Sequence, residues 1–309
     1  METDYFVMNT GTLKRKARKH KADKQYFAYL LLLPTLLVIT SFHVLPIFFS
    51  FGLSTLNWDL ISEARFVGLR NFRLLASDQL FWKSVWNTFY YTAMAVPMNI
   101  IFSLSVAMLL NNKIKGIDAY RVIYFIPVIT SINAVSIVWR LMYHPNYGLL
   151  NQLLGMVGLP RQRWLLDPRW AMFSIVMMSV WKGLGYNVII FLTGLKNIPQ
   201  HLYEAATVDG AGRWHKFRHI TWPLLSPVTF FIFVMSIIGS FQVFAQIYMM
   251  TPGGGPMNST MTIVFYLYKV GFGQFHFGYA AAIAFELFLM IFVLTLLQKL
   301  VVEKRVHYQ

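Results

Sequence analysis

Long apolar segments alternate with short polar ones along almost the whole chain. Six of these segments reach the roughly 20 residues of helix that the hydrocarbon core of a bilayer requires. They cover residues 26–51, 85–110, 122–142, 170–195, 222–250 and 279–301. Between Lys24 and Asp59 no Asp, Glu, Lys or Arg interrupts the sequence, and soluble proteins do not carry uncharged helices of that length. The pattern therefore predicts an all-α polytopic membrane protein with six transmembrane helices.

The composition is typical of a membrane protein, and it also bears on which classes of partner the chain can have. Of the 309 residues, 57% are hydrophobic and 13% are charged, and the mean hydropathy is +0.52. The net charge of +15 comes mainly from basic residues that flank the apolar segments, not from one amphipathic face. This distribution favours contact with membrane lipid and argues against a nucleic-acid partner. The chain has no cysteine, so it can form neither a disulfide nor a thiolate metal site.

Basic residues also set the expected orientation. The positive-inside rule predicts that the segment before the first span stays in the cytoplasm. Its basic residues are Lys14, Arg15, Lys16, Arg18, Lys19, Lys21 and Lys24. Six spans return the C-terminus to the same side, with Lys113 and Lys115 in an inner loop. We therefore expect a basic cytoplasmic tail (1–25), a membrane domain (26–302) and a short cytoplasmic tail (303–309). The first apolar segment is too long for a cleavable signal peptide.

A polar segment between the fourth and fifth spans has a distinctive pattern. It reads Glu204-Ala205-Ala206-Thr207-Val208-Asp209-Gly210-Ala211 and continues through Phe217, Ile220 and Pro223. Alanine favours a short helix with a surface that a partner can approach closely, and Gly210 permits a sharp turn. The later spacing fits a second short helix. The sequence therefore predicts a helix-turn-helix loop at about residues 196–221, called the coupling loop below.

The coupling loop resembles the cytoplasmic signature loop of permease subunits in ATP-driven, binding-protein-dependent (ABC) importers. The resemblance implies the type I importer permease fold and a loop that inserts into a cleft on an ATPase subunit. The residues that it assigns to this contact are Glu204, Ala205, Ala206, Asp209, Gly210, Ala211, Phe217 and Pro223. It also implies that Glu204 pairs with a basic group of the ATPase. The alternative is that Glu204 and Asp209 are solvated surface charges.

The same resemblance implies which partners to expect. The chain has no Gly-x-x-x-x-Gly-Lys-Ser/Thr segment for binding a nucleotide. ATP and Mg²⁺ are therefore expected on two cytoplasmic ATPase subunits, and this chain is expected to have no cofactor, metal or catalytic residue. A second, related permease subunit should complete the pathway as a heterodimer, with a homodimer as the alternative. An external solute-binding protein would deliver the solute at a bacterial cytoplasmic (inner) membrane.

Other segments resemble the sugar-importing, maltose-type permeases. These are Asn57-Trp58-Asp59, the stretch from Phe66 to Phe72, Phe125-Ile126-Pro127, and the stretch from Thr251 to Pro256. The resemblance places solute contacts in the fourth and fifth spans, where aromatic faces suit sugar C–H surfaces and polar side chains suit sugar hydroxyls. The candidates are Ser179, Trp181, Lys182, Gly183, Tyr186, Asn187, Gly239, Ser240, Gln242, Val243 and Phe244. The alternative is that these residues join neighbouring helices.

Two ionisable residues, Lys182 and Glu286, fall inside predicted spans. A charge within the membrane needs a partner or a wet cavity. Lys182 lies among the solute candidates, so it could recognise an acidic sugar such as a uronate. A structural ion pair between Lys182 and Glu286 is the alternative.

Rival functions find less support in the sequence. The histidines His201, His215 and His219 have no carboxylate or cysteine at ligand spacing, which argues against a metal site. An ion-coupled carrier would need a set of buried carboxylates, and a membrane enzyme would need a nucleophile, a base or a metal. Within the importer class, permeases for glycerol phosphate, amino acids or peptides remain the alternative to a sugar permease.

Overall fold

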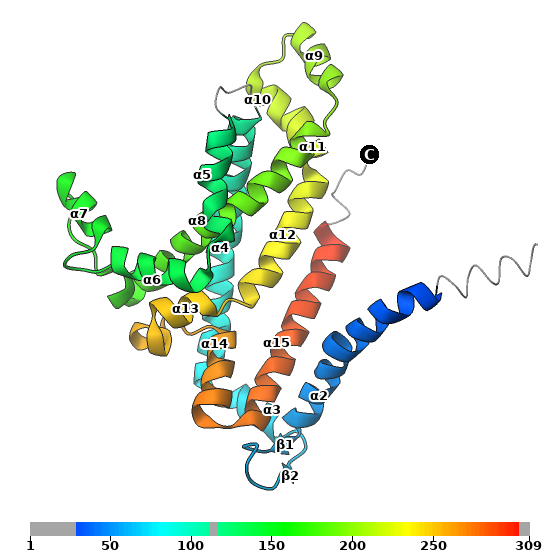
Figure 1. Ribbon diagram of the computed structural model, residues 1–309, viewed down its shortest axis with the longest axis vertical. Helices are drawn as coiled ribbons and strands as arrows, with labels where there is room; N and C mark the ends of the chain where they lie inside the picture. Colours follow the sequence, from blue (N-terminus) through cyan, green and yellow to red (C-terminus); the bar gives the residue numbers. More distant parts are fainter. Residues whose placement is uncertain (1–28, 112–116, 303–309) are drawn as a thin grey trace, which may run out of the picture. The chain divides into compact units, whose positions relative to one another are not determined.

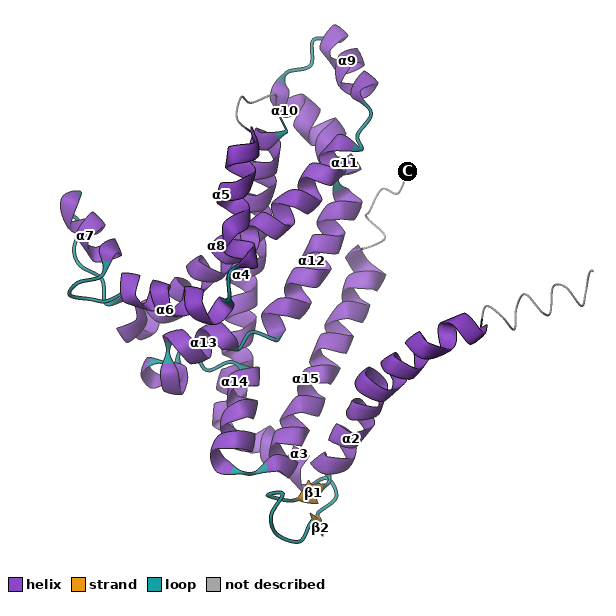
Figure 2. Ribbon diagram, in the orientation of Figure 1, coloured by secondary structure: helices purple, strands orange, loops and turns teal. Residues whose placement is uncertain are grey.

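The computed structural model describes residues 29–111 and 117–302. The basic N-terminal tail, Lys113, Lys115 and the C-terminal tail lie outside the described residues. The described chain forms two compact units, one ending at Leu53 and the other beginning at Ser54, and each is described by itself. Both units are helical, and the described residues contain a single two-stranded sheet (Figure 2).

The first unit is one long apolar helix. The helix runs over Tyr29–Ser54 and so continues by one residue into the second unit. It includes a π-helical segment, η1 (Thr40–Val44), which is followed by α2 (Leu45–Ser54). In a regular α-helix the ring of Pro46 would crowd the carbonyl of Phe42, and the wider π turn encloses that position. This helix agrees with the first predicted span.

Three helices of the second unit are long enough to cross a membrane without a break. They are α4 (Gln79–Leu110), α8 (Pro168–Lys196) and α15 (Phe277–Leu297), which η7 (Gln298–Val302) extends. Asp167 caps α8 by accepting a hydrogen bond from the Arg169 backbone N–H at 2.9 Å, and Pro168 occupies the first turn. Helix α8 packs along α4 more extensively than any other described pair. These helices confirm the second, fourth and sixth predicted spans.

The third predicted span is not a single straight helix. Residues 122–142 divide into α5 (Ile117–Ile129) and α6 (Ile132–Met142), and the two are bent by 108° at Thr130 and Ser131. Pro127 lies two residues before the end of α5, where it removes one N–H donor from the last turn. The third predicted span therefore consists of a bent pair of helices, which counts as one span only if both arms are taken together.

The fifth predicted span is also interrupted. It is preceded by α10 (Arg213–Lys216) and η3 (Phe217–Thr221), and it contains α11 (Trp222–Leu224), α12 (Ser226–Phe241) and α13 (Ala245–Met250). A bend of 64° separates the helix ending at Leu224 from α12, beside Pro223 and Pro227. A second break lies at residues 242–244, where the Thr262 hydroxyl donates to the Val243 carbonyl at 3.1 Å. By length and composition, four described helices can span a membrane, or six if each bent pair counts as one span.

Short elements close one end of the second unit. Strand β1 (Leu56–Asn57) pairs antiparallel with β2 (Arg65–Phe66), and Leu56 lies opposite Phe66. Helix α3 (Arg70–Ser77) follows, and its buried Asn71 donates to the carbonyls of Ser54 and Leu56 at 2.8 and 2.9 Å. The remaining described elements are α7 (Leu149–Met156), η2 (Trp164–Leu166), α9 (Gln200–Val208), η4 (Pro252–Gly254), η5 (Pro256–Asn258), α14 (Ile263–Tyr268) and η6 (Lys269–Gly273). In Figure 1 the sheet and α9 lie at opposite ends of the long helices, as the predicted topology requires.

The buried side chains form two clusters. The larger joins α4, α6, α8, α13, α14 and α15. The smaller, called the knob-side cluster, consists of Leu104, Ala107, Leu110, Val188, Phe191, Leu192, Leu195, Ile198, Leu225 and Ile232. The knob-side cluster joins α4, α8 and α12 near the coupling loop, so it can connect the loop to the long helices.

Asp78 joins three elements at the sheet end. Its carboxylate caps α4 by accepting from the Leu80 N–H at 2.8 Å, and it also accepts from the hydroxyls of Tyr266 and Tyr279. Burial raises the pKa of Asp78, but the bonds from Tyr266, Tyr279 and the backbone outweigh burial and hold the pKa below the ordinary value of 3.8. The carboxylate therefore fixes the start of α4 against α14 and α15.

Asp78→Asn is expected to destabilise the purified protein at neutral pH. A charged acceptor of several hydrogen bonds is lost, and we expect the melting temperature to fall by about 2–6 °C. Because the folded-state pKa is lowered, the stabilisation is fully present above the ordinary value of 3.8 and disappears as the pH falls through the folded pKa. Melting curves at pH 7, 5 and 3 measure this difference, which should shrink only at the lowest pH. An equal difference at all three values would contradict the role of the charge.

Candidate functional site

The coupling loop stands at one end of the second unit and begins with α9 (Figure 1). After α9 the chain turns at Gly210, whose φ is +75°. The Ala211 N–H donates to the Ala206 carbonyl at 2.8 Å, and the Gly210 N–H donates to the Thr207 carbonyl at 3.1 Å. This pair of bonds is the Schellman motif, which requires a left-handed residue where Gly210 stands. The predicted turn therefore has a defined geometry.

The surface of α9 is open to a partner. No residue of α9 is buried, and Glu204, Ala205 and Asp209 are exposed while Ala206 and Ala211 are half-buried. Two large apolar side chains are also exposed: Val208 at 88% and Trp214 at 70%. The sequence analysis did not single out either residue. Each is a bulky apolar residue inside a polar segment, and this pattern could have indicated an exposed apolar contact surface.

The second arm of the coupling loop fastens it to the long helices. Phe217 and Ile220 lie in η3, Pro223 lies in α11, and Phe217 and Ile220 pack against the knob-side cluster. The Tyr203 and Thr221 hydroxyls are hydrogen-bonded at 2.9 Å, so this bond links α9 to the second arm. Lys216 adds a bond of 2.7 Å from its ammonium to the Thr207 hydroxyl. A force applied to α9 would therefore reach α8 and α12.

The histidines of the coupling loop do not form a metal centre in the structure. His215 and His219 stack with ring centroids 4.1 Å apart, and the Nδ1 atom of His219 lies 3.1 Å from the His215 carbonyl oxygen. Within residues 29–111 and 117–302 there is no group of three His, Cys, Asp or Glu side chains that could hold a metal ion.

The solute candidate Ser179 lies near two other polar side chains beside the larger cluster. The Gln246 amide of α13 lies 3.5 Å from the Ser179 hydroxyl of α8 and 3.5 Å from the Tyr91 hydroxyl of α4. These distances are at the limit of a hydrogen bond, and Tyr91 is buried while Ser179 and Gln246 are half-buried. Tyr91 was not among the sequence candidates, because a tyrosine in an apolar helix gives no sign of its partners.

Asn187 and Gly183 occupy the contact between α8 and α4. The Asn187 amide donates to the Asn99 Oδ1 at 2.6 Å, and the Ser103 hydroxyl donates to the same oxygen at 3.1 Å. A Cβ on Gly183 would lie 2.9 Å from the Asn99 Nδ2. These contacts favour the alternative in which the two residues join helices.

The other candidates differ in exposure. Trp181 and Tyr186 of α8 are 44% and 56% exposed. At the break between α12 and α13, Gly239 and Gln242 are exposed, whereas Ser240 and Val243 are buried. Phe244 joins an aromatic group with Tyr268 at 5.0 Å and Tyr248 at 5.5 Å between ring centroids.

Lys182 has partners that the sequence analysis did not anticipate. Its ammonium donates to the carbonyls of Pro127 at 3.2 Å and Thr130 at 3.0 Å, with a longer contact of 3.5 Å to Val128. Among the described residues Lys182 forms no ion pair with Glu286, whose carboxylate has no hydrogen bond there either.

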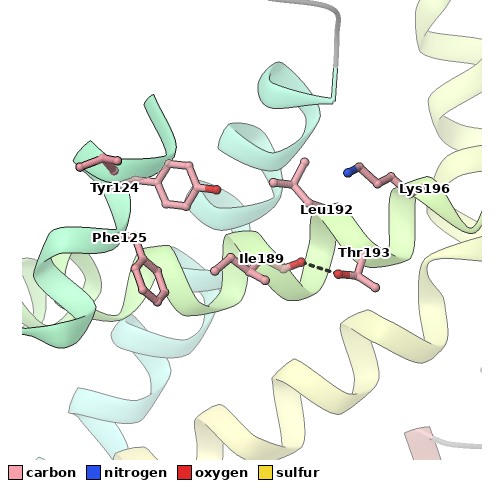
Figure 3. Close-up of a pocket in the computed structure, with 7 residues that line it drawn as sticks. Tyr124, Phe125, Ile189, Leu192, Thr193 and Lys196 are labelled. Atoms are coloured by element: carbon pink, nitrogen blue, oxygen red, sulfur yellow. Dashed lines mark hydrogen bonds between the residues drawn. The ribbon is translucent and has the colours of Figure 1, made fainter. Parts of the chain in front are cut away.

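A groove lies beside α8 on the side of the coupling loop. It is lined by Val122, Tyr124, Phe125, Ile189, Leu192, Thr193 and Lys196. Figure 3 shows Tyr124 and Phe125 on α5, and on α8 it shows Ile189, Leu192, Thr193 and Lys196, with Lys196 at one end. Tyr186, Ile189, Thr193 and Lys196 follow one another at helical spacing and are all exposed. The groove therefore continues the exposed α8 face on which Tyr186 lies.

Comparison with known proteins identifies the family to which this chain is similar. The family model described as "Binding-protein-dependent transport system inner membrane component" matches residues 74–307. A probable ABC transporter permease protein of Bacillus subtilis (strain 168), YesP, is 35% identical over 97% of this chain and 98% of its own. The trehalose/maltose transport system permease protein MalF of Thermococcus litoralis is 38% identical, over 93% of this chain and 96% of its own. A solved bacterial alginate ABC transporter, in complex with an alginate pentasaccharide-bound periplasmic protein, contains a chain of the same fold, with a TM-score of 0.79, 22% identity and coverage of 91% and 95%.

Proposed function

Because this chain belongs to the family of binding-protein-dependent transport system inner membrane components, we propose that it is the permease subunit of an ATP-driven carbohydrate importer. The observation that carries the proposal is the coupling loop: a Schellman-capped helix with exposed small residues, fastened to α8 and α12. Relatives that match nearly the whole chain are permease proteins, so this subunit is a membrane component without catalysis of its own.

A carbohydrate is the solute class that the site and the relatives favour. The relative from Thermococcus litoralis is named for trehalose and maltose transport. In this chain the exposed aromatic rings of Trp181 and Tyr186 on α8 can stack on sugar rings, and Ser179 and Gln246 can bond sugar hydroxyls. Glycerol phosphate, amino acids and peptides are the alternative solutes.

In the proposed mechanism, movement of the coupling loop is transmitted to the helices that carry the solute candidates. ATP and Mg²⁺ would bind the partner ATPase subunits, and their closure would displace α9. The bond between Tyr203 and Thr221 and the packing of Phe217 and Ile220 would transfer this displacement to the knob-side cluster. Since that cluster contains residues of α8 and α12, both helices that carry the solute candidates would move together.

The proposed assembly contains this chain, a second and related permease subunit, two cytoplasmic ATPase subunits and an external solute-binding protein. The solved alginate transporter includes a periplasmic protein that carries its oligosaccharide, which supports the last of these partners. We place the complex in the bacterial cytoplasmic membrane with both termini of this chain inside.

Cross-linking tests the coupling loop directly. The natural chain has no cysteine, so Val208→Cys, at 88% exposure, introduces a single reactive group. In the complex purified with its ATPase subunits, a short bifunctional thiol reagent should join the cysteine introduced by Val208→Cys to a cysteine placed in the ATPase cleft, and added ATP should change the yield. Ile61→Cys, in the loop between β1 and β2 and 86% exposed, is the matched control and should give no cross-link.

Proteoliposomes test the solute. Uptake of an oligosaccharide should require ATP and the solute-binding protein together. Uptake driven by an ion gradient alone, or a cross-link from Ile61→Cys in place of Val208→Cys, would contradict the proposed function.

A further inference from the structure

The broken span formed by α5 and α6 is held by two consecutive residues of α8. The Lys182 ammonium contacts the carbonyls of Pro127, Val128 and Thr130 at 3.2, 3.5 and 3.0 Å. These oxygens lie at the end of α5 and in the break that follows it. Lys182 has three N–H donors, and its Nζ atom lies within 3.5 Å of three carbonyl oxygens at this end of α5 and in the break.

The end of α5 needs such a partner. The last four carbonyls of an α-helix have no N–H donor within the helix, and leaving them unpaired inside a membrane costs free energy. The Thr130 hydroxyl bonds one of them, the Ile126 carbonyl, at 2.8 Å. Lys182 bonds the Pro127 carbonyl and lies 3.5 Å from the Val128 carbonyl, and its positive charge also suits the negative end of the helix dipole. The cap therefore comes from a residue 55 positions along the chain from Pro127.

Close packing allows Lys182 to reach the end of α5. Gly185, one helical turn after Lys182, lies against α5 so closely that a Cβ there would be 2.2 Å from the Tyr124 carbonyl oxygen. The bare backbone of α8 at Gly185 thus brings the two helices together. Lys182 then lies beside the last turn of α5, within reach of its carbonyls.

The other arm of the break is held by the neighbouring residue. Trp181 contacts Trp139 of α6 with 5.5 Å between ring centroids and 55° between ring planes. Arg140 adds a long contact of 3.4 Å from α6 to the Met249 carbonyl of α13. Trp181 therefore contacts α6 while Lys182 contacts α5.

We propose that Lys182 is a positioning residue that caps α5 and, with Trp181, fixes the 108° angle between α5 and α6 against α8. Its ammonium donates hydrogen bonds to backbone carbonyls at the end of α5 and does not contact the solute. Loss of Lys182 must then affect neutral and acidic solutes alike. The proposal rests on the proposed function only for the uptake measurement, because the angle itself can be measured without transport.

Distance measurements between spin labels test the angle. Labels at Ile123→Cys on α5 and Leu141→Cys on α6, both exposed, report the two arms directly in a chain without native cysteine. We expect one narrow distance distribution in the parent, at least a doubling of its width with Lys182→Met, and a smaller broadening with Lys182→Gln, which keeps an amide donor. Lys196→Met is the control: this lysine lies on the same helix, is exposed, and should leave the width unchanged.

The outcomes separate the two roles of Lys182. If Lys182→Met fails to accumulate in the membrane, Lys182→Gln decides the question, and an unbroadened distribution in that variant overturns the proposal. Uptake of a neutral oligosaccharide and of a uronate-containing one of equal length should fall by the same factor. A loss confined to the uronate would instead assign Lys182 to solute recognition. If neither sugar is taken up by the parent complex, the proposed function fails while the distance result still stands.

Discussion

Gly210→Pro is expected to abolish ATP-coupled uptake while the membrane domain still inserts. Gly210 has a φ of +75°, whereas proline is restricted to about −65°. Proline also lacks the N–H that Gly210 donates to the Thr207 carbonyl. The Schellman motif would be lost and α9 would leave its position, so we expect uptake in proteoliposomes to fall at least about tenfold while protein in the membrane stays near parental levels.

Two variants separate backbone geometry from bulk. A Cβ at Gly210 meets nothing within 4 Å, so Gly210→Ala carries only the conformational strain, about 1–2 kcal/mol, and should show an intermediate loss. Gly212 has a φ of −68°, which proline adopts, and its Cβ position is also open. Gly212→Pro should therefore retain most uptake. Equal loss from both proline variants would show that the loop needs general flexibility and not the turn at Gly210.

Gly185→Val is expected to prevent stable folding. The added Cβ would lie 2.2 Å from the Tyr124 backbone oxygen and 2.8 Å from the Val128 Cγ2. A backbone oxygen inside a helix cannot move aside as a side chain can, so α8 and α5 would separate. Overpacking of this kind costs about 1–3 kcal/mol or more, and we expect little protein in the membrane or a melting temperature lower by about 5 °C or more.

Gly155→Ala provides the matched comparison for Gly185. Gly155 also lies in a helix, α7, but its added Cβ meets nothing within 4 Å. We expect its melting temperature to equal or slightly exceed that of the parent, because alanine favours helix. A stable, fully monodisperse Gly185→Val protein would show that α5 and α8 do not pack as closely as the structure has them.

The straight helices could be predicted from sequence, but the breaks could not. Length and apolarity suffice for α4, α8 and α15, and Asp167-Pro168 marks the start of α8. Proline is an ambiguous signal, however. Pro97 lies inside the continuous α4, whereas Pro127 lies just before the break after α5. The difference is that Lys182 supplies the carbonyl partners at the second position, and a contact between distant residues leaves no local pattern.

The coupling loop was predictable for a different reason. Its turn depends on local chemistry, the left-handed Gly210 after a short alanine-containing helix, so sequence spacing describes it well. The solute candidates depend on which side of α8 faces a path, and apolar residues surround this helix. Sequence could not show that Asn187 contacts Asn99 of α4 while Tyr186 is exposed.

The carboxylate of Asp78 has a consequence for how the subunit can move. It joins the start of α4 to Tyr266 of α14 and Tyr279 of α15, so these three elements share one fixed corner at the end opposite the coupling loop. A displacement of α9 would therefore rotate the long helices about the corner that Asp78 fixes. The joint at residues 242–244, between α12 and α13, is not helical, and we expect the displacement of the chain to be largest there.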